Sequence, residues 1–220
     1  MPIFKAKNEN FFRKWSPEMA YILGFFAADG NMLKNKRGAH FIEFQITDRD
    51  LLIKIRNSNH KITARKRNNK WRTSYRLQIG SKQIFKDLLK LGLTPKKSKT
   101  INLPNIPEKY FYHFVRGYFD GDGNVIFGFF KKSDRKTKSP ALLTRFTAGS
   151  KSILEKLHDV LTNTLDTRGS LCYCGDAWRL SYSTNDSKKL FSFMYNSGNV
   201  AGLIYLKRKF ILYKKANLGR

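Results

Sequence analysis

The sequence predicts an α+β protein built from two similar halves, and three observations lead to that prediction. Two segments, residues 22–31 and 115–124, carry a glycine, a phenylalanine and a closing Asp-Gly-Asn at the same spacing. The elements expected after each segment follow in the same order, as in an internally duplicated chain. A proline- and lysine-rich stretch at residues 94–106 is typical of a linker. We therefore expect one half over residues 1–100 and the other over residues 101–220.

The first half begins with a helix signal at residues 16–18, where Ser-Pro-Glu supplies an N-cap, a proline at the first helical position and an acid in the first turn. The helix should run through residues 21–28 and end at Gly30. Alternating apolar residues predict a strand at 41–46, and one-sided apolar spacing predicts a helix at 48–55. Residues 61–67 and 71–79 predict a very basic hairpin, followed by a helix over residues 81–91.

The second half repeats this order with few identities outside the motif. A helix should begin at residues 107–108 and run to Gly121. A strand is expected at residues 142–147, a helix from residue 150, a strand at 177–182 and a last helix that includes residues 188–191. The shared order of elements, more than sequence identity, supports the duplication.

The charge of the chain predicts a polyanionic partner. Lysine and arginine together number 43 against 16 acidic residues, which gives a net charge of +27. A hydrophobic content of 41% and an aromatic content of 14% indicate a folded protein. The basic residues are interleaved with apolar ones and form no single cationic amphipathic helix. We therefore expect nucleic acid as the partner instead of a membrane surface, the alternative being a merely cationic soluble protein.

The sequence also predicts an intracellular location, in the cytoplasm or nucleoid or in an organelle matrix. No apolar run is long enough to span a membrane, and residues 1–5 do not resemble a signal peptide. Cys172 and Cys174 lack the histidine pair that would complete a zinc site. They are too close along the chain to be well placed for a mutual disulfide, so we expect reduced thiols with a structural role.

The two motif segments predict a pair of packed helices. Gly24 and Gly117 fall in mid-helix, where glycine costs about 1 kcal/mol relative to alanine unless another backbone approaches closely. Further small residues follow on the same half of each helix, at Ala27, Ala28 and Gly121. If the helices pack with their ends level, Asp29 and Asp122 lie side by side.

Two acids at helix C-termini favour a divalent cation. The helix end carries partial negative charge that disfavours an acid by roughly 0.3–1 kcal/mol, and neighbouring carboxylates repel each other. Mg²⁺ relieves both effects because it takes carboxylate and carbonyl oxygens as ligands and keeps waters beside a phosphate. A single Asp-Gly is usually only a turn or a helix cap, but the matched pair predicts phosphodiester hydrolysis.

The two segments resemble the LAGLIDADG motif of homing endonucleases, and the duplicated order resembles the single-chain members of that family. The resemblance implies two pseudo-symmetric αββαββα halves, paired motif helices at the interface and a saddle of two antiparallel sheets. It implies Mg²⁺-dependent double-strand cleavage of a long DNA target by a monomer, with Ca²⁺ or Mn²⁺ as substitutes. The family's catalytic acids map to Asp29 and Asp122, which bind metal with the carbonyls of Ala28 and Gly121. The first motif departs from the family at Ala27, where the second keeps an acid.

The resemblance also implies supporting residues in each half. A water-ordering polar residue maps to Asp48, and Ser150 takes its place in the repeat. A basic residue near the scissile phosphates maps to Lys97 and Lys209, each of which could instead be a phosphate contact or a solvated charge.

Strand alternation predicts which side chains face the DNA. Arg72, Arg76 and Gln78 share one parity in the first half, and the other candidates are Arg65 and Arg67 there and Arg168, Arg179 and Ser181 in the second half. Lys131 and Lys132 begin a loop over residues 131–138 that we expect to be a flexible, phosphate-binding turn. Arginine and glutamine can pair bidentately with guanine and adenine, whereas lysines should touch phosphates. Any one of them could instead be a solvated surface residue.

Two other functions remain open from the sequence. The same scaffold could bind nucleic acid without cutting it, as an intron RNA maturase or a DNA-binding regulator. An endonuclease insert of a self-splicing protein is less expected, because the sequence begins with Met-Pro and ends with Gly-Arg.

Overall fold

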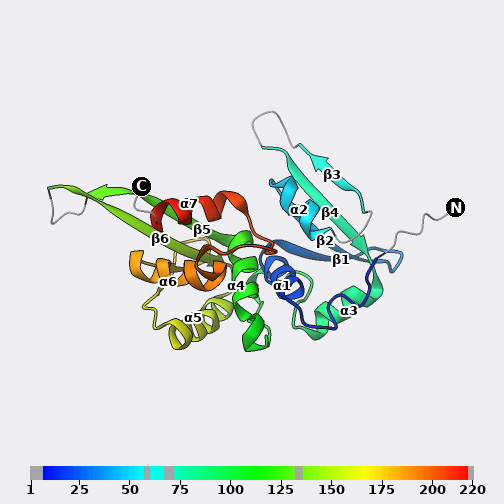
Figure 1. The fold of residues 1–220 in the computed structure, drawn as a ribbon. Helices are drawn as coiled ribbons and strands as arrows, with labels where there is room; N and C mark the ends of the chain where they lie inside the picture. Colours follow the sequence, from blue (N-terminus) through cyan, green and yellow to red (C-terminus); the bar gives the residue numbers. More distant parts are fainter. Residues whose placement is uncertain (1–6, 57–59, 67–71, 132–135, 218–220) are drawn as a thin grey trace. The chain divides into compact units, whose positions relative to one another are not determined.

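The computed structural model describes residues 7–56, 60–66, 72–131 and 136–217 (Figure 1). Packing separates the chain into two compact units, residues 1–97 with 104–121 and residues 98–103 with 122–220. The helix α4 (Glu108–Asp122) therefore packs with the first unit up to Gly121, although in sequence it opens the second half. The fold is the α+β, two-half arrangement expected from the sequence.

The first unit joins helices to a four-stranded antiparallel sheet of order β1-β2-β4-β3. The strands are β1 (Gly30–Lys34), β2 (His40–Ile46), β3 (Ile62–Arg65) and β4 (Ser74–Gly80), and the helices before α4 are α1 (Pro17–Asp29), α2 (Arg49–Ile55) and α3 (Lys82–Lys90), followed by the 3₁₀ turn η1 (Lys97–Lys99). Alternate residues of the central strands, such as Ile42, Phe44 and Leu77, are buried against the helices. The opposite residues of these strands form a second, mostly polar face.

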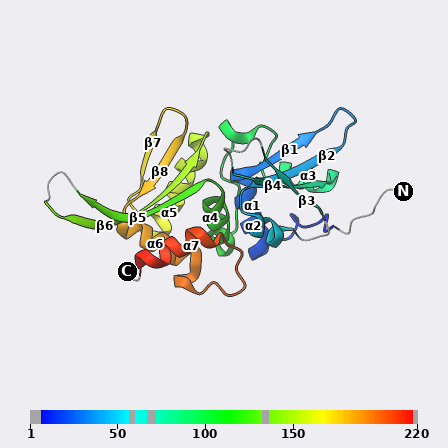
Figure 2. The same cartoon turned by 90° about the horizontal axis from the view of Figure 1, so that it is seen from above.

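The second unit repeats the sheet with order β5-β6-β8-β7 (Figure 2). Its strands are β5 (Gly123–Lys131), β6 (Lys138–Ala148), β7 (Ser170–Tyr173) and β8 (Trp178–Tyr182), and its helices are α5 (Lys151–Leu165), α6 (Thr184–Tyr195) and α7 (Lys207–Asn217), with the 3₁₀ turn η2 (Asn196–Gly198). Phe146, Leu180 and Tyr182 are buried on the face that meets the helices. The final helix α7 packs beside α6 and has no helical counterpart among the described residues of the first unit.

The predicted elements are confirmed over the described residues, with differences at their ends, and residues 67–71 of the predicted hairpin lie outside those residues. Ser16 caps α1, since its hydroxyl accepts a hydrogen bond from the Met19 amide at 3.1 Å. The loop expected over residues 131–138 begins and ends in paired strand residues, Lys131 of β5 and Lys138 of β6, and its residues 132–135 lie outside the described part of the chain. Cys172 and Cys174 are free thiols, as expected, and both are exposed, with their sulfur atoms 3.4 Å apart.

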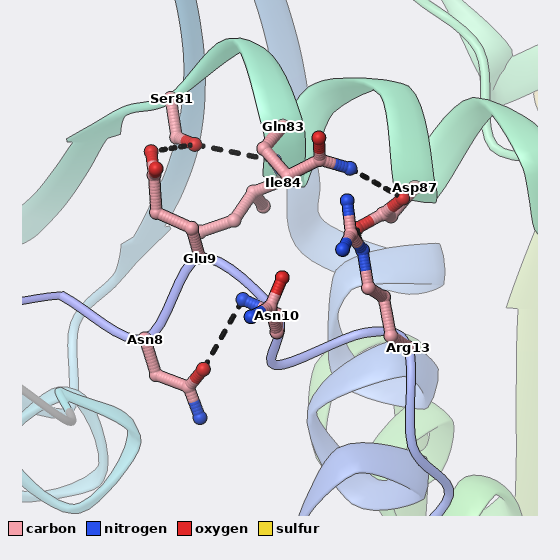
Figure 3. A network of polar contacts seen from close by, with 8 residues as sticks. All are labelled: Asn8, Glu9, Asn10, Arg13, Ser81, Gln83, Ile84 and Asp87. Carbon is pink, nitrogen blue, oxygen red and sulfur yellow. Dashed lines mark hydrogen bonds and ion pairs between the residues drawn. The ribbon is translucent and has the colours of Figure 1, made fainter.

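The segment before α1 is tied to α3 by polar contacts (Figure 3). The Ser81 hydroxyl donates to Glu9 at 2.7 Å and accepts from the Ile84 amide, so one side chain caps α3 and holds the segment. Arg13 Nε donates to the buried Asp87 at 3.2 Å. Hydrogen bonds, first from Lys7 and then from Ser81, hold the pKa of Glu9 below its usual value. These contacts anchor the segment that leads into α1.

A membrane-spanning helix is absent from the described part of the chain.

Candidate metal site and nucleic-acid interface

The contact between α1 and α4 depends on the two mid-helix glycines. A Cβ atom placed on Gly24 would come within 2.1 Å of the Phe114 carbonyl oxygen. A Cβ atom on Gly117 would come within 2.0 Å of the Tyr21 carbonyl oxygen. Each glycine thus admits the backbone of the other helix, and the predicted reason for these glycines is confirmed.

The C-terminal ends of the motif helices carry the predicted acids. Asp29 is the last residue of α1, and Asp122 is the last residue of α4; both are half-buried. A Cβ atom on Gly121 would lie 2.4 Å from the Ala28 Cβ atom and 3.5 Å from Asp29 Oδ2. The residue directly before Asp122 therefore lies beside Ala28 and the carboxylate of Asp29. Ala28 and Gly121 are also the residues whose carbonyls the sequence predicts as ligands.

The sixth motif position has a structural role in α4. Asp120 is buried, and its Oδ2 atom accepts a hydrogen bond from the Tyr21 hydroxyl of α1 at 2.7 Å. The Arg116 guanidinium lies 5.3 Å from the centre of the Tyr21 ring. In the first motif, Ala27 occupies this position and is buried. At this motif position, therefore, α4 carries an acid that bonds α1, whereas α1 carries an alanine that offers no such bond to α4.

A buried histidine belongs to the same polar cluster. Arg116 Nη2 lies 2.8 Å from His113 Nδ1. Because arginine can only donate, Nδ1 must accept, and the imidazole is the neutral tautomer protonated at Nε2. Burial, and secondarily the charge of Arg116, lowers the pKa of His113 to about 4.

The two predicted lysines occupy corresponding positions in their units. Lys97 is 6% exposed, and its ammonium donates to the Gly30 carbonyl. Lys209 is 3% exposed, and its ammonium donates to the Gly123 carbonyl at 2.6 Å. Each glycine directly follows a motif acid. A buried positive charge therefore lies next to the acid-bearing turn of each unit.

The third predicted pair is less symmetric. Asp48 is the N-cap of α2, and its Oδ1 atom accepts from the Leu51 amide at 3.1 Å. Ser150 precedes α5 at the matching place but makes no capping hydrogen bond. Its hydroxyl donates instead to the Ile101 carbonyl at 2.8 Å. The described contacts of both residues stabilise the local fold.

The polar face of the first sheet carries several predicted DNA-contacting residues. Arg76 and Gln78 lie on β4, and Arg65 lies at the end of β3, on the face opposite Leu77. Arg72 is exposed and precedes β4, and Arg67 lies outside the described residues. Sequence reasoning missed Glu43 on β2, which contacts both Arg76 and Gln78. Its signal was a lone acid within an apolar strand.

The matching face of the second sheet is arranged differently. Arg179 and Ser181 lie on β8, opposite Thr147 and Arg145 of β6. Arg145, which sequence reasoning missed, donates from Nε to the Ser181 hydroxyl at 3.2 Å. The exposed residues Arg168 and Lys131 lie before β7 and at the end of β5, and Lys132 is outside the described residues.

The donor set of the motif ends suits a hard cation. Carboxylate and carbonyl oxygens are the ligands that Mg²⁺ and Ca²⁺ prefer. Within the described ranges, histidine, cysteine and acidic side chains form no group of three that could hold a metal. A cation at the motif ends would therefore depend on the two motif acids, backbone carbonyls, water and a substrate phosphate.

Comparisons with known proteins agree with this architecture. Residues 16–92 match the model of the LAGLIDADG-like domain. The solved structure of meganuclease I-SmaMI bound to uncleaveable DNA superposes with a TM-score of 0.63 at 15% identity, covering 92% of this chain and 89% of that one. The homing endonuclease I-LtrWI bound to target DNA gives a TM-score of 0.58 at 15% identity, covering 96% and 90%. The fold is that of the single-chain LAGLIDADG meganucleases.

Two archaeal proteins are similar in sequence over shorter regions. An uncharacterized protein of Methanocaldococcus jannaschii is 29% identical over 120 residues, which are 50% of this chain and 40% of that protein. The RNA polymerase subunit Rpo1C of the same organism is 27% identical over 143 residues, or 63% of this chain and 15% of the subunit. The chain thus spans less than half the length of these relatives. Residues 16–92 thus carry a LAGLIDADG-like domain, and the chain as a whole has the fold of the LAGLIDADG meganucleases.

Proposed function

We propose that this protein is a site-specific endonuclease that makes metal-dependent double-strand breaks in a long DNA target. The observation that carries the proposal is the reciprocal glycine contact between α1 and α4, at whose ends Asp29 and Asp122 stand. The DNA-bound state of the solved relatives I-SmaMI and I-LtrWI supports the choice of substrate.

The motif ends would hold Mg²⁺ through Asp29, Asp122 and the carbonyls of Ala28 and Gly121. When bound, the cation would supply Lewis-acid stabilisation of the phosphate and of the leaving oxygen. Lys97 and Lys209 bring a fixed positive charge beside each acid, where it would stabilise the charge that develops on a scissile phosphate. Asp48 is proposed to order water near the first acid. These side chains and the cation together would drive hydrolysis.

DNA would lie along the polar faces of the two sheets. The net charge of +27 supplies sequence-independent affinity through phosphate contacts. Side chains on the two strand faces, including Arg76, Gln78 and Arg179, would contact base edges. The second unit has fewer basic residues in its hairpin β7–β8, so we expect weaker base discrimination on that side of the target.

The test is digestion of a randomised duplex library with Mg²⁺, with Ca²⁺ and EDTA arms in parallel. We expect sequence-specific double-strand breaks with Mg²⁺ and none with EDTA. A complex of I-SmaMI with uncleaved DNA exists in the presence of calcium ions, so the Ca²⁺ arm should report binding without cutting. Retention of one sequence without breaks in any arm would instead favour a non-cleaving binder, and retention of RNA alone would favour a maturase.

Substitution of the acids tests the site itself. Asp29→Asn, Asp122→Asn and the double variant should lose cleavage by about a thousandfold or more while keeping DNA binding. Asp159→Asn, which changes an exposed acid of α5, is the matched control and should cut like the parent. A double variant that still cuts the same site with Mg²⁺ would refute the assignment.

A further inference from the structure

A buried acid lies in the middle of the polar face that we propose to meet DNA. Glu43 is on the central strand β2 and is 8% exposed. It lies directly opposite Gln78 of β4, and its neighbour Gln45 lies opposite Arg76, so these side chains share one face of the sheet. An acid here weakens attraction to phosphate, and burying its charge requires close partners.

The partners of Glu43 are two side chains able to recognise bases. Its Oε2 atom accepts a hydrogen bond from Arg76 Nη1 and another from Gln78 Nε2, both at 3.2 Å. The Arg76 side chain is 24% exposed, and its Nε atom is buried without a described hydrogen-bond partner. Arg76 is thus held through Nη1, and because Nε is buried, the donors that remain for a base are the other N–H groups of Nη1 and Nη2.

The pairing leaves defined recognition chemistry on each partner. With Nη1 engaged, Arg76 still has N–H groups for the O6 and N7 acceptors of guanine. Gln78 keeps its carbonyl oxygen and its second amide hydrogen, the donor–acceptor pair that recognises adenine. A carboxylate that fixes both side chains reduces the entropy lost when they meet a base.

We infer that Glu43, Arg76 and Gln78 form one base-reading unit, in which Glu43 positions Arg76 for a guanine and Gln78 for a neighbouring adenine. This inference rests on the proposed function, since it assigns a part of the DNA target to three residues. Glu43 is a positioning residue here and makes no phosphate contact. The cost of an acid on a DNA-facing surface is offset by the selectivity it confers.

The second sheet provides the contrast that makes the inference testable. There, Arg145 is held by the neutral hydroxyl of Ser181, with no acid among the described partners of that pair. Removal of Ser181 should release Arg145 without changing the charge of the surface. Ser181→Ala is therefore the matched control for Glu43→Gln.

The experiment measures binding in Ca²⁺ to duplexes that carry each of the four base pairs at every position of the selected target. The parent should prefer guanine at one position of the first half-site by about tenfold or more. Glu43→Gln should reduce that preference to roughly threefold or less, with other positions unchanged. Ser181→Ala should leave this position as in the parent. Arg76→Lys, which keeps the charge but loses the fork, should abolish the same preference, and adding Glu43→Gln to it should change little more.

Two results with these variants would overturn the inference. If Glu43 acts only as a repulsive charge, Glu43→Gln will raise affinity for every duplex equally and leave the base profile unchanged, which overturns the inference. Should Glu43→Gln fail to fold, Arg76→Lys tests the same base-reading unit, because an unchanged base profile in that variant also overturns the inference. A parent that binds selectively but does not cut would refute only the proposed cleavage, and a parent that selects no sequence would refute both.

Discussion

The two units place the same charge at the same point through different local structures. In the first unit, Lys97 belongs to the short turn η1, and in the second unit Lys209 belongs to the helix α7. Both ammonium groups nevertheless bond the carbonyl of the glycine that follows the motif acid. The two units therefore share a buried lysine ammonium beside the motif acid, although the lysine belongs to a 3₁₀ turn in one unit and to an α-helix in the other.

The units also differ on the sheet faces. The first sheet carries a buried acid between an arginine and a glutamine, whereas the second carries an arginine bonded to a serine. Under the proposed function, an enzyme with two similar halves that reads a non-palindromic DNA target would need two equal chemical centres and two unequal reading surfaces. The two units of this chain show that combination, since their lysine contacts beside the acids match and their sheet faces differ.

The largest effect should come from filling the glycine contact. Gly24→Leu and Gly117→Leu each force a side chain against a carbonyl oxygen of the other helix, and each should lower the free energy of unfolding by about 3 kcal/mol or more. Where folded protein remains, cleavage should fall further than DNA binding. Urea unfolding measures the first effect, with Gly128→Ala as a control whose added methyl group meets only the Phe130 ring. Parent-like stability in either variant would contradict the close-packing argument.

The next effect is a loss of stability in acid that arises in the first unit. His113 has a folded-state pKa of about 4, below its usual 6.5, so the unfolded chain binds more protons between these values. The stabilisation is present above pH 6.5 and is lost as the pH falls toward 4, by an amount on the order of 3 kcal/mol. Unfolding measured across this range should show a slope that flattens in His113→Asn. An unchanged slope in that variant would assign the acid sensitivity to other groups.

The motif helices and the order of the elements could be predicted because they rest on short-range spacing. The glycine and the acid of each motif have the same spacing, at Gly24 and Gly117 and at Asp29 and Asp122. Apolar and polar residues alternate along the strands, and this alternation can be seen in a short stretch of sequence. The pairing of Glu43 with Arg76 could not be predicted, since it depends on strand register between residues far apart in sequence. The contact of α4 with α1 of the first unit, by contrast, was predicted from the two mid-helix glycines. Lys97 and Lys209 were found only through the family resemblance.

An equal loss of cleavage on removing either lysine would show that the two halves are alike in function at this position. Lys97→Met and Lys209→Met keep most of the buried side-chain volume but remove the charge beside each acid. Each should slow cleavage by roughly 100-fold and leave binding in Ca²⁺ within about threefold. Single-turnover cleavage is the measurement, and Lys156→Met, on the exposed surface of α5, is the control. A loss confined to one lysine would mean that the corresponding contacts have different roles.

The smallest effect separates two roles of Asp48. As the N-cap of α2, Asp48 should cost about 1 kcal/mol of stability when changed to alanine and almost none when changed to asparagine, which caps equally well. If its carboxylate also orders water for cleavage, Asp48→Asn should slow the reaction while the unfolding midpoint stays the same. Ser150→Ala, at the matching place of the second unit, removes a hydrogen bond to Ile101 and should lower stability by about 1 kcal/mol. Full activity of Asp48→Asn would reduce Asp48 to a helix cap and would show that the two halves need no acid at this position.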